Sequence, residues 1–306
     1  MTRILLRIIM GGVIIILLPL GAYFSSVLAD GVTDETHHSS RGAHEEESGY
    51  DSKGDSYAVA SQLPEATASN VVAEHIRTVL AENGIHECRV DVESSDYVFL
   101  HIGDTNVVDL SALRDLPLTH LSIPRSEVVD LSPLRGMPLK HLRMSRSRVV
   151  DLSPLRGMPL HCLNVCGTGV RNLLPLSQMS LLTLLMDDTK VNDLTALKGM
   201  ALKGLAFNNT AVSDLRPVSS MPLRIIRFRG TRIRDITCLM NMPLRTVEFS
   251  PEQIERGIEA MRKMTNLTDI NFLPAEVFWE EYDAGTLDSD YSQREYVYER
   301  DAGGNR

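Results

Sequence analysis

The sequence predicts an α/β solenoid, a horseshoe of 21-residue repeats with short parallel strands on its concave face and short helical turns on its convex face. A twelve-residue string, Val128 to Leu139, returns letter for letter 21 residues later as Val149 to Leu160. An Asp-Leu step, or a close equivalent, recurs at that spacing without insertion or deletion, and alternating apolar residues precede it. A fixed period in this range is typical of solenoids, in which each unit buries its apolar face against its neighbours. The steps begin at Asp109, Asp130, Asp151, Asn172, Asp193, Asp214 and Asp235.

Each repeat contains a short strand followed by a polar exit. In the second copy, Leu163 and Val165 alternate with polar residues, as a half-buried strand requires. Thr168 follows, and a hydroxyl occupies the same place in every repeat; we expect it to hydrogen-bond the backbone where the chain leaves the strand.

The return path of each repeat is a short turn. Ser132-Pro133 and Ser153-Pro154 predict a serine N-cap followed by proline at the first helical position. Gly136 and its equivalents are mostly residues that tolerate a left-handed conformation, which should end the turn. Met-Pro-Leu then prevents further helix and begins the next strand. The convex side should therefore be thin.

These repeats resemble bacterial leucine-rich repeats of the type Asp-Leu-Ser-Pro-Leu-x-Gly-Met-Pro-Leu. Such repeats often follow a serine/threonine kinase domain and also occur in stand-alone exported proteins. The resemblance covers roughly residues 69–285 and extends to the closing segment Pro274–Gly285. It implies a protein-binding horseshoe and supplies no catalytic residues. Because this sequence contains neither a glycine-rich phosphate loop nor a kinase catalytic-loop motif, kinase activity is excluded, and we expect no enzyme and no cofactor.

Residues 1–29 have the pattern of an export segment. Arg3 and Arg7 precede a stretch without charge from Ile8 to Ala29, and acidic residues follow, which places the remainder outside the cytoplasm. Val27-Leu28-Ala29 fits the cleavage site of a signal peptide, whereas the uncharged stretch is also long enough for an uncleaved membrane anchor. Both alternatives predict a periplasmic, cell-surface or secreted protein, and membrane contact arises only if this segment is retained.

The remaining chain divides into flanks and an array. We expect a disordered acidic linker at 30–68, an N-terminal cap at 69–96, repeats at 97–249, a C-terminal cap at 250–285 and a polar tail at 286–306. The N-terminal cap should be a helix capped by Ser69 and ended by Gly84, and a strand at Cys88–Val92.

The C-terminal cap should begin with a capping box. Ser250-Pro251-Glu252-Gln253 has that pattern and should open a helix that places Ile254, Ile258 and Met261 on one face. A last strand should contain Leu267, Ile270 and Phe272. Beyond it, bulky residues should form a lid, namely Val277, Phe278, Trp279 and Tyr282.

Charge and cysteine content limit the function classes. The formal charge of −9 comes mainly from the linker and the C-terminal end, so the body is nearly neutral and offers no dominant basic field for nucleic acid. Cys162 and Cys166 should lie about 13 Å apart on one strand, beyond the roughly 7 Å that a disulfide spans. We expect these two, Cys88 and Cys238 to be free thiols.

The residues between the core positions of each strand should form the concave binding surface, which varies while the frame repeats. The expected partner is a protein or an envelope polymer. The surface candidates are Phe99, His101, His120, Arg143, Asn164, Leu185, Asp187, Asn208, Arg227, Arg229 and Glu248.

Two other functions remain open. His120, His141 and Cys162 occupy one column on three successive strands, about 4.8 Å apart, and could bind zinc for a metal-dependent activity, with His101 assisting. Alternatively, the array could serve as a structural spacer in the envelope.

Overall fold

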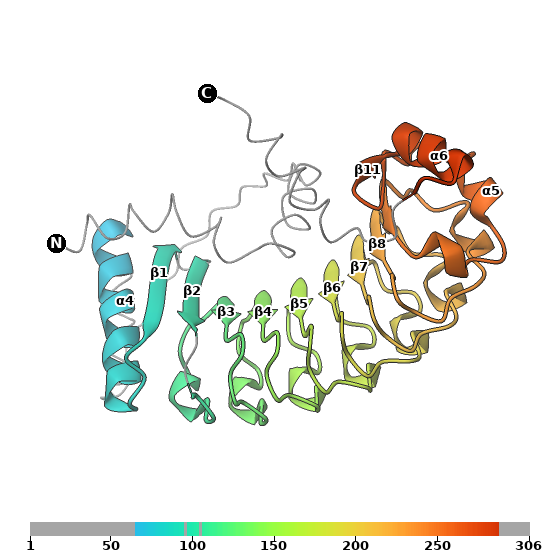
Figure 1. Ribbon diagram of the computed structural model, residues 1–306. Helices are drawn as coiled ribbons and strands as arrows, with labels where there is room; N and C mark the ends of the chain where they lie inside the picture. The colour runs from blue at the N-terminus through green and yellow to red at the C-terminus, as the bar shows by residue number, and fades with distance from the viewer. Residues whose placement is uncertain (1–64, 95–96, 104–105, 288–306) are drawn as a thin grey trace, which may run out of the picture.

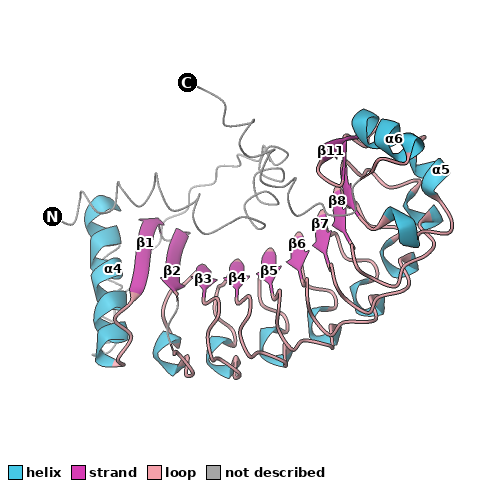
Figure 2. Cartoon of the chain, viewed as in Figure 1, coloured by secondary structure: helices cyan, strands magenta, loops and turns pink. Residues whose placement is uncertain are grey.

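The computed structural model describes residues 65–94, 97–103 and 106–287 and shows an open, curved solenoid (Figure 1). An 11-stranded sheet lines the inner side of the arc, and its strands follow one another in chain order. Short turns occupy the outer side (Figure 2). The predicted export segment, the linker as far as residue 64, Thr105 and the tail from residue 288 lie outside the described residues.

The repeats form a leucine-rich-repeat horseshoe, as predicted. Adjacent repeat strands pair in parallel and in register, so that Leu121 lies between Leu100 and Leu142. Each repeat strand has three residues. The repeat strands are β3 (His120–Ser122), β4 (His141–Arg143), β5 (Cys162–Asn164), β6 (Thr183–Leu185), β7 (Gly204–Ala206), β8 (Ile225–Arg227) and β9 (Thr246–Glu248).

Seven 3₁₀ turns line the convex side of the described array, each starting two residues after the repeated aspartate or asparagine. The prediction of a serine N-cap is wrong. The backbone N–H of Ser132 donates to the Asp130 carboxylate at 2.8 Å, and the Ser132 side chain makes no cap hydrogen bond. The same bond recurs in all seven repeats. The turns are η1 (Ser111–Leu113), η2 (Ser132–Leu134), η3 (Ser153–Leu155), η4 (Leu174–Leu176), η5 (Thr195–Leu197), η6 (Arg216–Val218) and η7 (Thr237–Leu239).

The residue that ends each turn is left-handed in the first five repeats, as predicted. Gly136 has φ 77° and Gln178 has φ 64°. The last two repeats differ, because Ser219 and Met240 remain in the right-handed helical region just before that position. Neither Ser220 nor Asn241 has a positive φ.

The core is a continuous stack of equivalent residues. Leu131, Leu152 and Leu194 are each 1% exposed, which confirms their predicted inward direction. After each strand from β5 to β8 in the sequence, a threonine hydroxyl donates to the backbone carbonyl three residues earlier. The Thr168 hydroxyl, for example, donates to the Val165 carbonyl at 2.6 Å. The equivalent Ser126 hydroxyl is buried without a hydrogen-bond partner among the described residues.

The N-terminal cap consists of α4 (Glu65–Glu82), β1 (Cys88–Ser94) and β2 (Tyr97–Ile102). β1 and β2 pair antiparallel, and β2 continues into the parallel array. The predicted cap at Ser69 is wrong. The helix begins four residues earlier, at Glu65, because Glu65, Ala66 and Ala68 are good helix formers. Gly84, with φ 75°, follows the helix as predicted.

The C-terminal cap consists of η8 (Pro251–Gln253), α5 (Ile258–Met261), β10 (Asp269–Ile270), β11 (Leu273–Pro274) and α6 (Ala275–Ala284). The predicted capping box does not form, since Ser250 makes no cap hydrogen bond and instead accepts one from the Gly230 N–H at 3.2 Å. The expected single helix is interrupted at Gly257, which has φ 104°.

The last strand is shorter than predicted. It ends at Ile270, because Asn271 and Phe272 both have positive φ and turn the chain into the antiparallel β11. A two-residue hairpin turn of type I′ has positive φ at both central residues. Phe272 therefore lies in the turn, outside the strand.

An aromatic stack joins the late repeats to the C-terminal cap. The rings of Phe207, Phe228 and Phe249 follow one another at 6.1 and 5.8 Å, and Phe278 of α6 continues the series at 6.1 Å. Trp279 packs against Phe278 at 4.9 Å. The predicted aromatic lid is therefore continuous with the core, although Val277 is exposed.

Candidate binding surface

The concave surface consists of columns of side chains stacked across the strands. In the first column His120 lies between Phe99 and His141, and in the second Arg143 lies between Ser122 and Asn164. Both columns continue to Thr246 and Glu248 on β9. The sequence-predicted candidates are therefore brought onto one surface, which we divide into an aromatic-histidine part, an apolar centre and a charged end.

The aromatic-histidine part is a row of three rings, in which His120 and His141 stack and Tyr97 is tilted by 41° against His120. His120 lies between Tyr97 and His141, with 4.4 Å between ring centroids on each side. Burial lowers the pKa of His120 to about 3 and that of His141 to about 4, and the nearby Arg143 adds to both shifts. The two imidazoles are therefore neutral near pH 7 and present a largely uncharged face.

The predicted zinc ligands do not form a metal-binding cluster. His120 and His141 stack face to face, with 14° between their ring planes, and His120 Nδ1 lies 2.8 Å from the Thr119 hydroxyl. His101 Nδ1 lies 3.0 Å from the Ser122 hydroxyl. In the described part of the chain, no group of three His, Cys, Asp or Glu side chains is placed to hold a metal ion. The four cysteines are free.

The apolar centre contains Leu185, Ala206 and Ile225, with Cys166 packed beside them. These residues form a hydrophobic cluster separate from the continuous core. Because successive strand residues point to opposite faces, the centre occupies the concave side of β6, β7 and β8 while Leu184 and Leu205 point into the core.

The charged end is built around Glu248. Its carboxylate lies 3.5 Å from Arg227 Nε and 3.6 Å from Arg229 Nε. The Arg227 guanidinium also lies over the Phe272 ring, 5.4 Å from its centroid, which is a cation–π distance. The hairpin turn of the C-terminal cap thus closes this end of the surface.

A polar ladder runs beside the apolar centre. The Asn208 N–H donates to the Asp187 carboxylate at 2.6 Å, and the Arg229 N–H donates to the Asn208 side chain at 2.7 Å. Burial raises the pKa of Asp187 to about 6, although the bond from Asn208 opposes that shift. The Cys166 thiol lies 3.8 Å from the same carboxylate.

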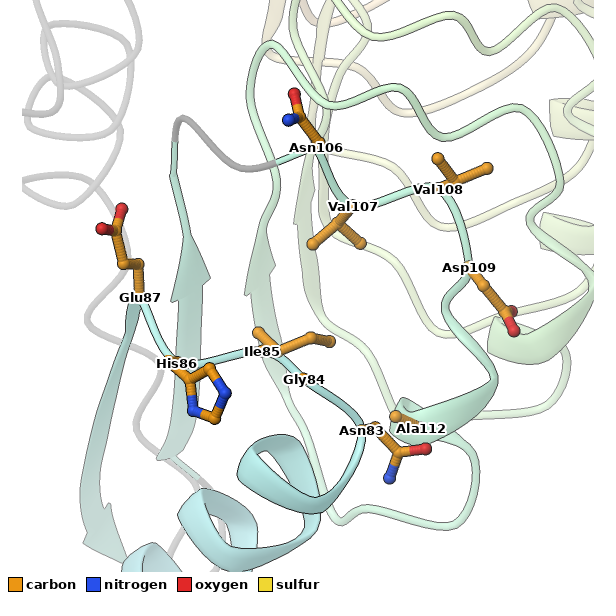
Figure 3. Close-up of a pocket in the computed structure, with 10 residues that line it drawn as sticks. All are labelled: Asn83, Gly84, Ile85, His86, Glu87, Asn106, Val107, Val108, Asp109 and Ala112. Atoms are coloured by element: carbon orange, nitrogen blue, oxygen red, sulfur yellow. The ribbon is translucent and has the colours of Figure 1, made fainter.

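A separate depression of about 490 Å³ lies at the junction of the N-terminal cap and the first repeat (Figure 3). His86 and Glu87 line it from the loop before β1, and Val107, Val108 and Asp109 line it from the repeat. It is distant in the array from the concave centre and brings no predicted site residue together.

Sequence reasoning missed four residues of this surface. Ala206 and Ile225 lie in the expected columns but were not expected to form an apolar centre. Tyr97 shares the alternation of Phe99 and His101, and that signal could have identified it. Phe272 gave no such signal, because the hairpin that places it follows a break in the 21-residue spacing.

The architecture and the in-register columns define a leucine-rich-repeat solenoid, and comparison with solved structures agrees. Internalin C2 of Listeria monocytogenes is 19% identical, with a TM-score of 0.51 over 70% of this chain and 95% of that chain. Internalin InlF of the same organism is 19% identical, with a TM-score of 0.49 over 69% of this chain and 70% of that chain. The functional domain of InlJ is 16% identical, with a TM-score of 0.37 over 56% and 43% of the respective chains.

The likeness to internalin C2 supports the fold alone. No protein-family model and no curated protein matches the chain. The finer resemblance to repeats that accompany bacterial kinases stays a prediction. Within residues 65–94, 97–103 and 106–287, no helix is long and apolar enough to cross a membrane.

Proposed function

We propose that this chain is a non-catalytic binding module that holds a protein partner on its concave surface. The observation that carries the proposal is the pair of concave columns, whose partly exposed side chains, among them His120, Arg143 and Asn164, differ from strand to strand on a uniform frame. Aromatic and arginine side chains are enriched in protein interfaces. The apolar centre, at most 3% exposed, and the buried Arg227–Glu248 pair hold the middle and the far end of this surface in place.

The frame supports this role. The register is uninterrupted from β2 to β9, and the residues facing inward to the arc differ from repeat to repeat. A rigid array with a varied surface lets a partner contact several strands at once without rearrangement, which lowers the entropic cost of binding. Export from a bacterial cytoplasm is part of the proposal and rests on residues 1–29.

A site-specific photo-crosslinking experiment tests the binding surface. A photoreactive amino acid at Asn164 on the concave side should give a discrete adduct with one envelope protein, whereas the same group at Arg156 on the convex turn should not. Arg143→Glu, which reverses the charge of the partly exposed side chain beside Asn164, should abolish the adduct. Equal labelling from both positions, or none from either, would support the structural-spacer alternative.

Analysis of the native N-terminus tests export. A cleaved signal peptide predicts a chain that begins at Asp30, and a retained anchor predicts full-length chain in the membrane fraction. Full-length chain recovered from the cytosol would contradict both.

A further inference from the structure

A shallow depression on the flank of the array collects three exposed cations. It lies where the chain leaves the strands β5 to β8 for the convex turns, and we call it the flank depression. Its volume is about 520 Å³, and Arg171, Lys190 and Arg232 line it together with Asn192 and Asn209. It is separate from the concave columns, because none of its lining residues belongs to a strand.

The three cations differ from their neighbours in having no acidic partner. On the same flank, Arg148 pairs with Glu127 at 2.7 Å, and Arg234 pairs with Glu255. Within the described residues, no carboxylate oxygen lies within 4.0 Å of the charged groups of Arg171, Lys190 and Arg232. The array therefore neutralises the cations on both sides of the flank depression and leaves those inside it uncompensated.

The polar groups of the flank depression add to this pattern. The Asn192 side chain is exposed and makes no hydrogen bond to the described residues. Asp188, an exposed neighbour, accepts a hydrogen bond from the Asn209 amide at 2.9 Å. The three lining cations and Asp188 together carry a formal charge of 3 − 1 = +2, and a positive potential of this kind attracts anions.

We infer that the flank depression binds a linear polyanion that carries tetrahedral oxyanion groups, phosphate or sulfate esters. Arg171 and Arg232 follow strands that lie three places apart in the sheet, a span of about 14 Å at the usual strand spacing. One oxyanion is too small to reach across that span, so a ligand with anionic groups at intervals fits better than a single ion. Arginine donors suit such groups because they bind them in a bidentate manner.

The lining favours a polymer over a protein partner. Ala211 is the one apolar residue among those that line the flank depression, and no aromatic side chain is among them. Protein interfaces depend on buried aromatic or aliphatic anchors, which the flank depression does not offer. This second site would bind independently of the concave surface.

Binding of fluorescein-labelled inorganic polyphosphate to the full chain, measured by fluorescence polarisation, tests the inference. Lys190→Glu and Arg232→Glu should each weaken binding about tenfold, since each replaces an attractive charge with a repulsive one. The matched control is Arg156→Glu, the same change at an exposed arginine of the convex turn, which should alter affinity by less than about twofold.

Competition identifies the chemistry of the ligand. Unlabelled polyphosphate and dextran sulfate represent phosphate and sulfate sources, and at least one should displace the label more effectively than poly-L-glutamate at equal charge. Equal competition by poly-L-glutamate would reassign the site to acidic peptides and overturn the inference. An equal loss in Arg156→Glu, or no binding by the unmodified chain, would also overturn it.

Discussion

Asp187 offers the sharpest test of the electrostatics of the concave surface. Its carboxyl is largely buried beside Cys166 and accepts the Asn208 N–H, and burial raises its pKa from 3.8 to about 6. At pH values between 3.8 and about 6, the Asp187 carboxyl holds a proton in the folded protein that it has released in the unfolded chain. The protonated carboxyl is compatible with folding, so stability falls as the pH rises through this window, and the cost is complete above about pH 6.

The size of this cost follows from the shift. About two pKa units correspond to about 3 kcal/mol, because each unit is worth about 1.4 kcal/mol. Asp187→Asn removes the ionisable group and keeps a side-chain oxygen that can accept the Asn208 N–H. We therefore expect this variant to be more stable than the unmodified chain by up to about 3 kcal/mol at pH 8, and to gain little at pH 4.

Urea unfolding followed by circular dichroism at the two pH values measures the difference. The matched control is Asp188→Asn, which removes the same charge from an exposed neighbour and should change stability little at either pH. An equal gain at pH 4 and pH 8, no gain at pH 8, or the same gain from Asp188→Asn would refute the reasoning.

Three further outcomes follow from the core and the stacked rings. Leu152→Asp places a charge at a residue that is 1% exposed and should unravel the array locally; an unchanged melting curve would contradict its inward direction. Phe228→Leu loses two ring contacts and should lower the free energy of opening of β8 and β9, measured by amide hydrogen exchange, by about 1–3 kcal/mol. Met186→Leu, at the equivalent position of an earlier repeat, should lower the free energy of opening by less than about 1.5 kcal/mol. Equal losses in the two variants would show that ring stacking contributes nothing. His141→Phe removes a group whose pKa is lowered to about 4, so the stability normally lost as the pH falls from about 6.5 to about 4 should be partly retained, and an unaltered acid profile would refute that account.

The repeat frame could be predicted in detail because its signal is iterated. The position of Leu152 in the core and the pairing of Leu100 with Leu121 both follow from the 21-residue spacing. A single repeat would have left strand and turn ambiguous, but seven equivalent steps leave one register that buries the leucine of each Asp-Leu step and its equivalents.

Local capping was harder to predict, because backbone carbonyls take the N–H groups that a Ser132 cap would bind. The Leu134 N–H donates to the Leu131 carbonyl at 2.9 Å and the Arg135 N–H donates to the Ser132 carbonyl at 3.2 Å. The N–H of Ser132 itself donates to the Asp130 carboxylate at 2.8 Å. Similarly, Ser250 matches a capping box, yet tertiary packing gives its hydroxyl the Gly230 N–H. Pattern alone does not contain these choices, since they depend on which backbone groups the fold brings near.

The columns of the candidate surface could also be predicted, whereas their chemistry could not. The spacing placed His120 beside His141 but did not show that the rings stack face to face. Likewise, Arg227 and Glu248 were expected on one column, and the contribution of Phe272 depends on a hairpin outside the periodic region. Rotamers and the cap geometry supply this information.

The aromatic stack gives the array a mechanical polarity. Phenylalanine rings join the late repeats to α6, whereas the equivalent residues in the early repeats are Ile123, Met144, Val165 and Met186. In a solenoid each unit contacts only its neighbours, so a pulling force separates it from an end. Under tension between the N-terminus and a partner held on the concave surface, we expect the early repeats to peel away first. The late repeats, joined to α6 by the phenylalanine rings, would then stay folded while the chain between them and the point of attachment lengthens.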